Sequence, residues 1–204
     1  FANQELSEKI LEKLNTKPRK SDLTSWKIMV NSALTAKNHA KIAMVGKYFS
    51  TGDYTLSDAY LSVIESIKHA AARFDIKPKM TWVDSAQIEK EGTDMLKGFD
   101  GIIVPGGYGT RAVEGIVTSI KFARENKIPY FGLCYGMQQA AVEFARNVLG
   151  YKDANTTEIN SKTKHPIIHV MQSQKDLVKY YKLGGTQRLG AWDWIAKKGT
   201  IFGK

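Results

Sequence analysis

Residues 128–150, IPYFGLCYGMQQAAVEFARNVLG, decide the fold. The apolar run IPYFGLC leads directly into a helical pattern, and the only cysteine of the chain, Cys134, lies at the junction. Gly132 and Gly136 flank it in the motif G-x-C-x-G. A nucleophile on a sharp turn from strand to helix needs small neighbours, and such a turn directs its side chain out of the sheet. The pattern therefore predicts a strand, a reactive thiol and a helix in succession.

The sequence between residues 41 and 150 alternates apolar runs with helical patterns. Strands are expected at 41–47, 77–85 and 128–134, and residues 100–109 are expected to form a strand that runs into a glycine-rich turn. Helices are expected at 56–74, 89–99, 112–126 and 135–150. The first of these helices is expected to start at Ser57 and Asp58. Alternation of this kind predicts an α/β fold with a mostly parallel central sheet and helices on both faces. Beyond 151 the pattern weakens to short strands at 165–171 and 184–190 and a hairpin at 192–202.

Residues 1–40 read differently from the remainder. Two short amphipathic helices are expected at 5–15 and 23–34, with a link rich in helix breakers between them. Two such helices cannot form a core of their own. We therefore interpret 1–40 as a helical interdomain linker and 41–204 as one domain.

The composition excludes several classes of protein. Apolar residues make up 43% and charged residues 25%, as in ordinary globular proteins. The net charge is +10, but the lysines are scattered along the chain and no nucleic-acid-binding motif is present, so a solvated basic surface is the favoured interpretation. There is no apolar run long enough to cross a bilayer and no signal-peptide pattern. A single cysteine fits a reducing cytoplasm.

Ligands of an open parallel sheet bind beyond the carboxyl ends of its strands. Two turns are expected there, PGGYGTR at 105–111 and GLCYG at 132–136. A helix N-terminus favours the thiolate form of Cys134, and the backbone N–H of Tyr135 can face an oxyanion. Gly106 and Gly107 allow the backbone of the other turn to approach a substrate. The alternative is that Cys134 is a small buried hydrophobe and the glycines form only a tight loop.

A longer series of motifs resembles a known family. The series consists of PGGYGTRAVEG, ARENKIPYFGLCYGMQ, EFARNVLG, ANTTE and GGTQRLG, in this order. It resembles the class I glutamine amidotransferases, and in particular the C-terminal glutaminase domain of the CTP synthases. The resemblance runs from about Lys41 to the end. It implies the flavodoxin-like amidotransferase fold and a cytoplasmic enzyme that hydrolyses glutamine through a cysteine thioester. The ammonia would aminate UTP to CTP in a synthetase domain that uses ATP and Mg²⁺, with GTP as activator.

The resemblance also implies residue roles. Cys134 would be the nucleophile, and the N–H groups of Gly107 and Tyr135 would form the oxyanion hole. The substrate would be held by Gly106, Gly107, Gln138 and Glu158, and Arg111 and Glu114 match a loop associated with the GTP response. No metal site is expected in this domain. Glutamine, the synthetase domain and the other subunits of a homotetramer would be the partners.

The chain also departs from the family pattern. Ala112 stands where a glycine is usual, Tyr135 where leucine is common, and Gln187 where methionine is usual. The family's Arg-rich stretch and its final His-Pro-Glu do not occur, and we do not expect any of the four histidines to replace the triad histidine. The sequence is therefore expected to be a piece of a longer protein, inactive or impaired by itself. A stand-alone hydrolase of the same class and a non-catalytic regulatory or assembly module stay as alternatives.

Overall fold

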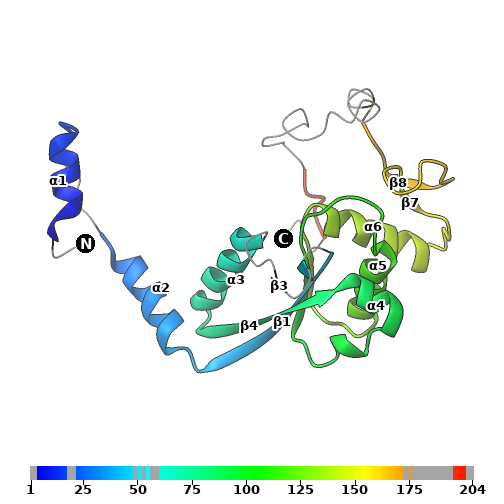
Figure 1. Ribbon diagram of the computed structural model, residues 1–204, viewed down its shortest axis with the longest axis horizontal. Coiled ribbons are helices and arrows are strands. Elements are labelled where there is room, and N and C mark those ends of the chain that lie inside the picture. Colours follow the sequence, from blue (N-terminus) through cyan, green and yellow to red (C-terminus); the bar gives the residue numbers. More distant parts are fainter. Residues whose placement is uncertain are drawn as a thin grey trace.

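A four-stranded parallel sheet forms the centre of the protein (Figure 1). The computed structural model describes residues 4–17, 22–47, 50–51, 54–55, 60–171, 175 and 195–200. The strands of the sheet lie in the order β4-β1-β5-β6. Their bounds are β1 Asn38–Gly46, β4 Ile76–Asp84, β5 Gly101–Val104 and β6 Tyr130–Gly132. All three pairings are parallel, so the four carboxyl ends share one edge.

Helices connect these strands, as parallel pairing requires. They are α3 (Leu61–Arg73), α4 (Ser85–Glu91) followed by a 3₁₀ turn at Asp94–Leu96, α5 (Val113–Glu125) and α6 (Tyr135–Asn147). Two small sheets accompany the central one: the antiparallel pair β2 (Ser50–Thr51) and β3 (Tyr54–Thr55), and the parallel pair β7 (Asn155–Thr156) and β8 (Pro166–Ile168). The predicted α/β class and parallel sheet are thus confirmed.

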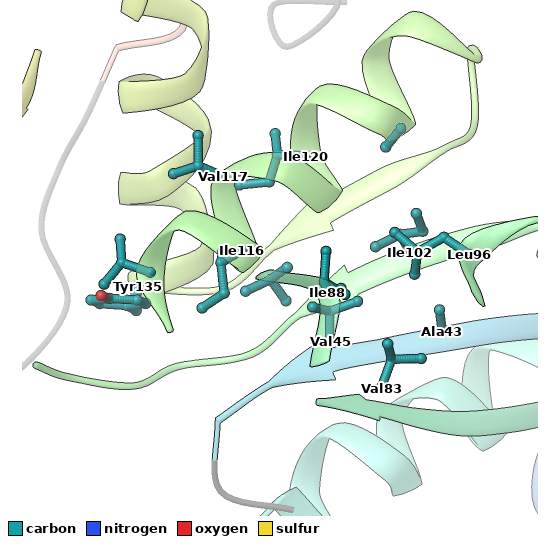
Figure 2. Close-up of a cluster of buried hydrophobic side chains, with 13 residues drawn as sticks. Ala43, Val45, Val83, Ile88, Leu96, Ile102, Ile116, Val117, Ile120 and Tyr135 are labelled. Carbon is teal, nitrogen blue, oxygen red and sulfur yellow. The ribbon is translucent and has the colours of Figure 1, made fainter. Parts of the chain in front are cut away.

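The core lies between one face of the sheet and the helices α4 and α5 (Figure 2). Ile116, Val117 and Ile120 of α5 are buried in this cluster. Alternate residues of the strands meet them, because successive side chains of a strand point to opposite faces. These are Ala43 and Val45 of β1, Val83 of β4, and Ile102 and Val104 of β5. Tyr135 closes the core at the carboxyl edge of the sheet.

The helix α3 covers part of the opposite face. An apolar cleft of about 620 Å³ lies between that helix and strand residues that include Ile42, Ile103 and Phe131. Phe131 belongs to the edge strand and is 60% exposed. The sheet thus has helices on both faces, but the face toward α4 and α5 is the more completely buried one.

Two helices precede the sheet, α1 (Leu6–Lys13) and α2 (Thr24–Thr35). In Figure 1, α1 lies farthest from the sheet and α2 leads toward α3. The Ser32 hydroxyl of α2 is buried, donates to the carbonyl of Ala72 at the end of α3 and bonds the carboxylate of Asp75. Trp26 and Leu34 of α2 are exposed. Assignment of residues 1–40 as a linker stays a prediction.

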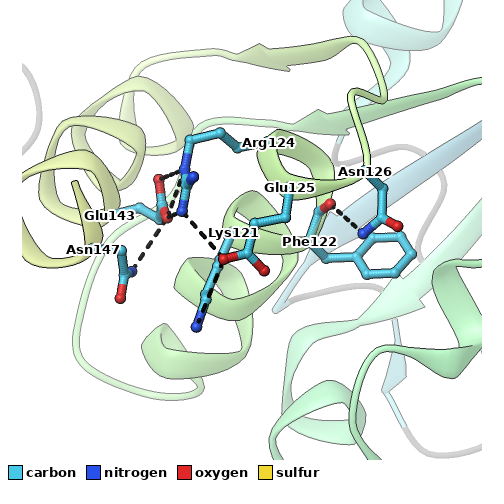
Figure 3. Close-up of polar contacts among 7 residues, drawn as sticks. All are labelled: Lys121, Phe122, Arg124, Glu125, Asn126, Glu143 and Asn147. Atoms are coloured by element: carbon cyan, nitrogen blue, oxygen red, sulfur yellow. Dashed lines mark hydrogen bonds and ion pairs between the residues drawn. The ribbon is translucent and has the colours of Figure 1, made fainter.

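A buried carboxylate fixes α6 against α5 (Figure 3). Glu143 is 1% exposed, and Arg124 of α5 donates to it through Nε and Nη2, the shortest contact being 2.8 Å. Asn147 donates to the same carboxylate at 3.2 Å. A buried charge requires such partners, because desolvation otherwise makes it very costly. The EFARN motif therefore holds the helix that carries the cysteine turn.

Element bounds differ from the expected ones at a few places. The first strand begins at Asn38, before the expected domain start at Lys41, because the ladder with β4 extends back to the pair Asn38 and Ile76. The helix expected at 89–99 instead begins at Ser85, where the Asp84 carboxylate caps it by accepting from Ala86 N–H at 2.7 Å. The strand expected at 184–190, most of the hairpin at 192–202 and the helix start at 57–58 lie outside the described residues.

Candidate functional site

The cysteine turn connects β6 to α6 at the carboxyl edge of the sheet. Cys134 is exposed and has φ 50° and ψ −102°, a positive-φ backbone conformation that is strained for a residue with a side chain. It immediately precedes the first helical residue, Tyr135. A strained, exposed residue between a strand and a helix is the geometry of a nucleophile elbow. The structure thus places the predicted nucleophile where the sequence indicated.

The two glycines of G-x-C-x-G are required by close backbone contacts. A Cβ on Gly132 would lie 2.5 Å from the carbonyl carbon of Gly136, and one on Gly136 would lie 2.2 Å from the carbonyl oxygen of Val104. Both distances are far below van der Waals contact. The spacing of the motif therefore allows α6 to begin directly against β5 and β6.

The glycine-rich loop at 105–109 packs beside this turn. A Cβ on Gly106 would lie 3.7 Å from the Cβ of Cys134. The hydroxyl of Tyr60 donates to the Gly106 carbonyl at 3.1 Å. A small cavity of about 10 Å³ lies under the loop, lined among others by Gly106 and Gly107. The two turns that the sequence singled out therefore lie together, with Gly106 next to the Cβ of Cys134.

Lys47, which the sequence analysis did not identify, contacts the glycine-rich loop through its buried ammonium. Its ammonium donates to the carbonyl of Gly109 at 2.7 Å and to the hydroxyl of Tyr135 at 2.9 Å. The residue is almost completely buried, with 4% exposed, and this desolvation lowers the pKa of Lys47 to about 8, while Glu158 and Glu89 oppose the shift. The available signal was its position, directly after a buried strand at the carboxyl edge.

The two side chains predicted to hold substrate lie at the same edge. Glu158 is exposed and accepts a hydrogen bond from the N–H of Gly109 at 2.8 Å. Gln138 is half-buried, one turn after Cys134, and its backbone N–H donates to the Cys134 carbonyl at 3.1 Å within the first turn of α6. The structure thus brings both residues to the edge where Cys134 lies, and their roles toward a substrate stay predictions.

The loop residues Arg111 and Glu114 fall at the start of α5. Both are exposed, and Arg146 of α6 donates to both carboxylate oxygens of Glu114 at 2.9 Å. Arg146 also donates to the Ala154 carbonyl at 2.6 Å, which joins EFARN to ANTTE. Ala112 caps α5 with φ 51° and ψ 34°, in the left-handed region. Since glycine adopts this conformation without strain, the geometry explains why alanine is a departure here.

All four histidines of the chain lie in described parts of the structure, and none of their rings is hydrogen-bonded to Cys134. His165 instead pairs with Asp153 through Nδ1 at 2.5 Å and stacks on Tyr151 with ring centroids 4.6 Å apart. This contact holds the pKa of the Asp153 carboxyl below its ordinary value. The described residues therefore supply the thiol, the loop and the two side chains predicted to hold substrate, but no histidine bonded to the thiol.

Neither a metal centre nor a membrane span is found in the described ranges. No three or more His, Cys, Asp or Glu side chains gather there as metal ligands would. Among the helices of these ranges, none combines the length and the apolar character needed to cross a bilayer.

Comparison with known proteins finds class I glutamine amidotransferases and CTP synthases as relatives of the chain. A family model described as "Glutamine amidotransferase class-I" matches residues 55–187. The CTP synthase of Sulfurisphaera tokodaii is 48% identical over 200 residues, which are 97% of this chain and 36% of that protein. The CTP synthase of Halalkalibacterium halodurans is 45% identical over 199 residues, again 97% and 36%. The chain thus spans about a third of the length of these curated relatives.

A solved structure agrees with this result. The glutaminase domain of Trypanosoma brucei CTPS with bound acivicin has a TM-score of 0.59 and 37% identity to the chain. The likeness covers 66% of this chain and 51% of that one.

Proposed function

The chain belongs to the class I glutamine amidotransferase family, and we propose that it hydrolyses glutamine at Cys134 as the glutaminase part of a CTP synthase. One observation carries the proposal. Cys134 is exposed on a positive-φ turn at the start of α6, and the glycine-rich loop lies so near that a Cβ added to Gly106 would contact the Cβ of Cys134. The CTP synthase relatives and the glutaminase-domain neighbour support the choice of glutamine as substrate.

In the proposed reaction, the thiolate of Cys134 attacks the side-chain carbonyl carbon of glutamine. The electron pair of the carbonyl moves to its oxygen, and the N–H groups of Gly107 and Tyr135 stabilise the resulting oxyanion. The carbon–nitrogen bond then breaks, and the leaving nitrogen takes a proton and departs as ammonia. Water hydrolyses the γ-glutamyl thioester to glutamate and returns the thiol.

We propose that Glu158 and Gln138 hold the remaining polar groups of glutamine. The carboxylate of Glu158 suits an α-ammonium, since charge-assisted hydrogen bonds are strong. The amide of Gln138, one turn into α6, suits the polar atoms of the substrate on the helix side. We propose that Gly106, whose added Cβ would lie 3.7 Å from the Cβ of Cys134, lies beside the bound substrate.

The wider role would be the supply of ammonia. We propose that a synthetase domain, of the kind found in CTP synthases, uses it to convert UTP to CTP with ATP and Mg²⁺. GTP activation through Arg111 and Glu114, a homotetrameric assembly and a cytoplasmic location belong to the same proposal. The ion pair of Glu114 with Arg146 gives this loop a direct connection to the helix of the nucleophile.

Turnover also needs a base for the thiol and an acid for the leaving nitrogen. Because none of the four histidines is bonded to Cys134, we expect the 204-residue chain to acylate slowly and turn over poorly. The same observation favours a second candidate function, a non-catalytic regulatory or assembly module that retains the fold.

Acylation distinguishes these candidates. The chain is incubated with radiolabelled glutamine and quenched with acid, and the label retained on the precipitated protein is counted beside that of Cys134→Ala. We expect acid-stable, hydroxylamine-sensitive label on the wild-type chain alone. Label on neither protein, with Cys134 still open to a small alkylating reagent, would contradict the glutaminase proposal and support the non-catalytic one.

A further inference from the structure

Lys47 is a buried cation at the carboxyl end of β1, directly after Gly46. Its ammonium has three donors, and three acceptors surround it: the Gly109 carbonyl at 2.7 Å, the Tyr108 carbonyl at 3.3 Å and the Tyr135 hydroxyl at 2.9 Å. Two of these acceptors belong to the glycine-rich loop, and the third belongs to the residue that follows the nucleophile.

The Tyr135 side chain completes the connection. Its hydroxyl donates to the Gly109 carbonyl at 2.7 Å, and the Lys47 ammonium lies 4.3 Å from the centre of its ring. Gly109 is therefore held at its carbonyl by two side chains, while its N–H donates to Glu158. A leucine at position 135 would keep the buried apolar volume but would make none of these polar contacts.

Core packing alone does not account for a lysine at this position. Burying an ammonium costs free energy, and an apolar chain of similar length would fill the same space without that cost. The polar contacts of Lys47 are directed at loop carbonyls and at Tyr135. The ammonium therefore acts on the position of the loop.

We propose that Lys47 and the hydroxyl of Tyr135 are positioning groups that fix the glycine-rich loop against the cysteine turn and so set the oxyanion site. The proposal rests on the function proposed above, because it concerns the donor geometry at Cys134. Neither group touches the substrate: Lys47 acts through the carbonyls of Tyr108 and Gly109, and the hydroxyl of Tyr135 acts through Gly109.

Protonation of Lys47 should then affect the site. Desolvation lowers the pKa of Lys47 to about 8, Glu158 and Glu89 raise it, and Arg111 lowers it further. Tyr135 and Tyr60 are the other titratable side chains that line the cavity beneath the loop. Above this pH the ammonium loses its charge and one donor, so the hold on the loop carbonyls weakens. An arginine at position 47 would stay charged throughout this range.

The experiment uses the 204-residue chain and its variants Lys47→Met, Lys47→Arg, Tyr135→Phe and the double variant Lys47→Met/Tyr135→Phe. Tyr135→Phe retains the backbone N–H and removes only the hydroxyl. The matched control is Lys41→Met, which removes one exposed lysine from β1, the strand that Lys47 follows. Folding of each variant is checked by urea denaturation.

Two reagents separate the oxyanion site from the thiol. A chloroketone analogue of glutamine reacts with Cys134 through a tetrahedral adduct, whereas iodoacetamide alkylates the thiolate by direct displacement. We expect Lys47→Met to lower the chloroketone rate by about 10- to 100-fold, since a misplacement of about 1 Å has effects of this size. The iodoacetamide rate should change less than about twofold, and Lys47→Arg should recover part of the loss. Tyr135→Phe should cause a smaller loss that does not add fully in the double variant.

A pH series gives the second readout. The ratio of the chloroketone rate to the iodoacetamide rate should fall above about pH 8 in the wild-type chain and stay level in Lys47→Met. The amide resonances of Gly107 and Gly109 should titrate with Lys47 and lose this titration in Lys47→Met.

Equal losses with both reagents, or no loss with either, would overturn the positioning role. A level ratio and unchanged amide resonances across the pH series would overturn it as well. A wild-type chain that reacts with iodoacetamide but not with the chloroketone would instead refute the proposed glutaminase function. The amide titration would still report in that case whether Lys47 holds the loop.

Discussion

Replacement of Gly136 by alanine tests whether the cysteine turn depends on close packing of α6 against β5. The added Cβ would lie 2.2 Å from the carbonyl oxygen of Val104 and 2.9 Å from its Cβ. Carbon–oxygen contacts in proteins are ordinarily about 3.3 Å or longer, so the start of the helix must move by about 1 Å. Overpacking of this kind costs up to about 3 kcal/mol, and the helix propensity of alanine returns about 1 kcal/mol. The expected net loss in free energy of unfolding is therefore about 2 kcal/mol.

The assay is urea denaturation, combined with the rate at which the chloroketone analogue of glutamine labels Cys134. A shift of about 1 Å at the helix start also moves the Tyr135 N–H, so labelling should fall by about 100-fold. Gly150→Ala is the control, because it lies just beyond the other end of α6 with nothing within 4 Å of an added Cβ. Its positive φ of 82° should cost about 1 kcal/mol and leave labelling unchanged. Wild-type stability and labelling in Gly136→Ala would refute the reasoning.

Three further results are expected. Ala112→Gly should raise the free energy of unfolding by about 1 kcal/mol in urea denaturation, because Ala112 has φ 51°; a lower stability would contradict the strain argument. Arg124→Met should lower the free energy of unfolding by about 3 kcal/mol, because it leaves the Glu143 carboxylate buried and unpaired. Its control, Lys121→Met, breaks a partly exposed pair with Glu125 and should lower it by less than about 0.5 kcal/mol. Equal losses in the two variants would contradict the burial of Glu143. Burial lowers the pKa of Lys47 from its ordinary value of 10.5 to about 8, so between these pH values the unfolded state binds more protons and the free energy of unfolding should rise with pH. Lys47→Met should lack this rise when its urea denaturation is measured over the same pH range. The same pH dependence in both proteins would contradict the lowered pKa.

The sequence was sufficient to predict the sheet and the cysteine turn because both depend on local patterns. Buried parallel strands appear as short apolar runs, and the glycines around Cys134 are demanded by close backbone contacts at the turn. The strand order β4-β1-β5-β6 was not predicted, since it depends on contacts between distant segments. Bounds such as the start of β1 at Asn38 also depend on the partner strand.

The candidate site was predicted only in part. Motifs identify five residues that lie at one edge of the sheet in the structure: Cys134, Gly106, Gly107, Gln138 and Glu158. The role of Lys47 in holding the loop was missed: the sequence shows its position directly after a buried strand, but no local pattern reveals that its ammonium is buried.

Helix contacts account for two of the motifs. The contacts of Arg146 with Glu114 and of Arg124 with Glu143 join residues that are 32 and 19 positions apart. These ion pairs give the Glu143 and Arg146 side chains of EFARN a structural role. The hydrogen bond from Arg146 to the Ala154 carbonyl connects EFARN to ANTTE.

Glutamine-protected labelling of Cys134 is the most direct test of the central claim that this residue is the nucleophile of a glutamine site. Acivicin, which is bound in the Trypanosoma brucei glutaminase domain, serves as the reagent, and the adduct is mapped by peptide mass spectrometry. We predict one adduct, on Cys134, that L-glutamine suppresses and L-asparagine does not. Failure of acivicin to react while iodoacetamide still alkylates Cys134, or an adduct that forms equally fast in the presence of L-glutamine, would contradict the claim.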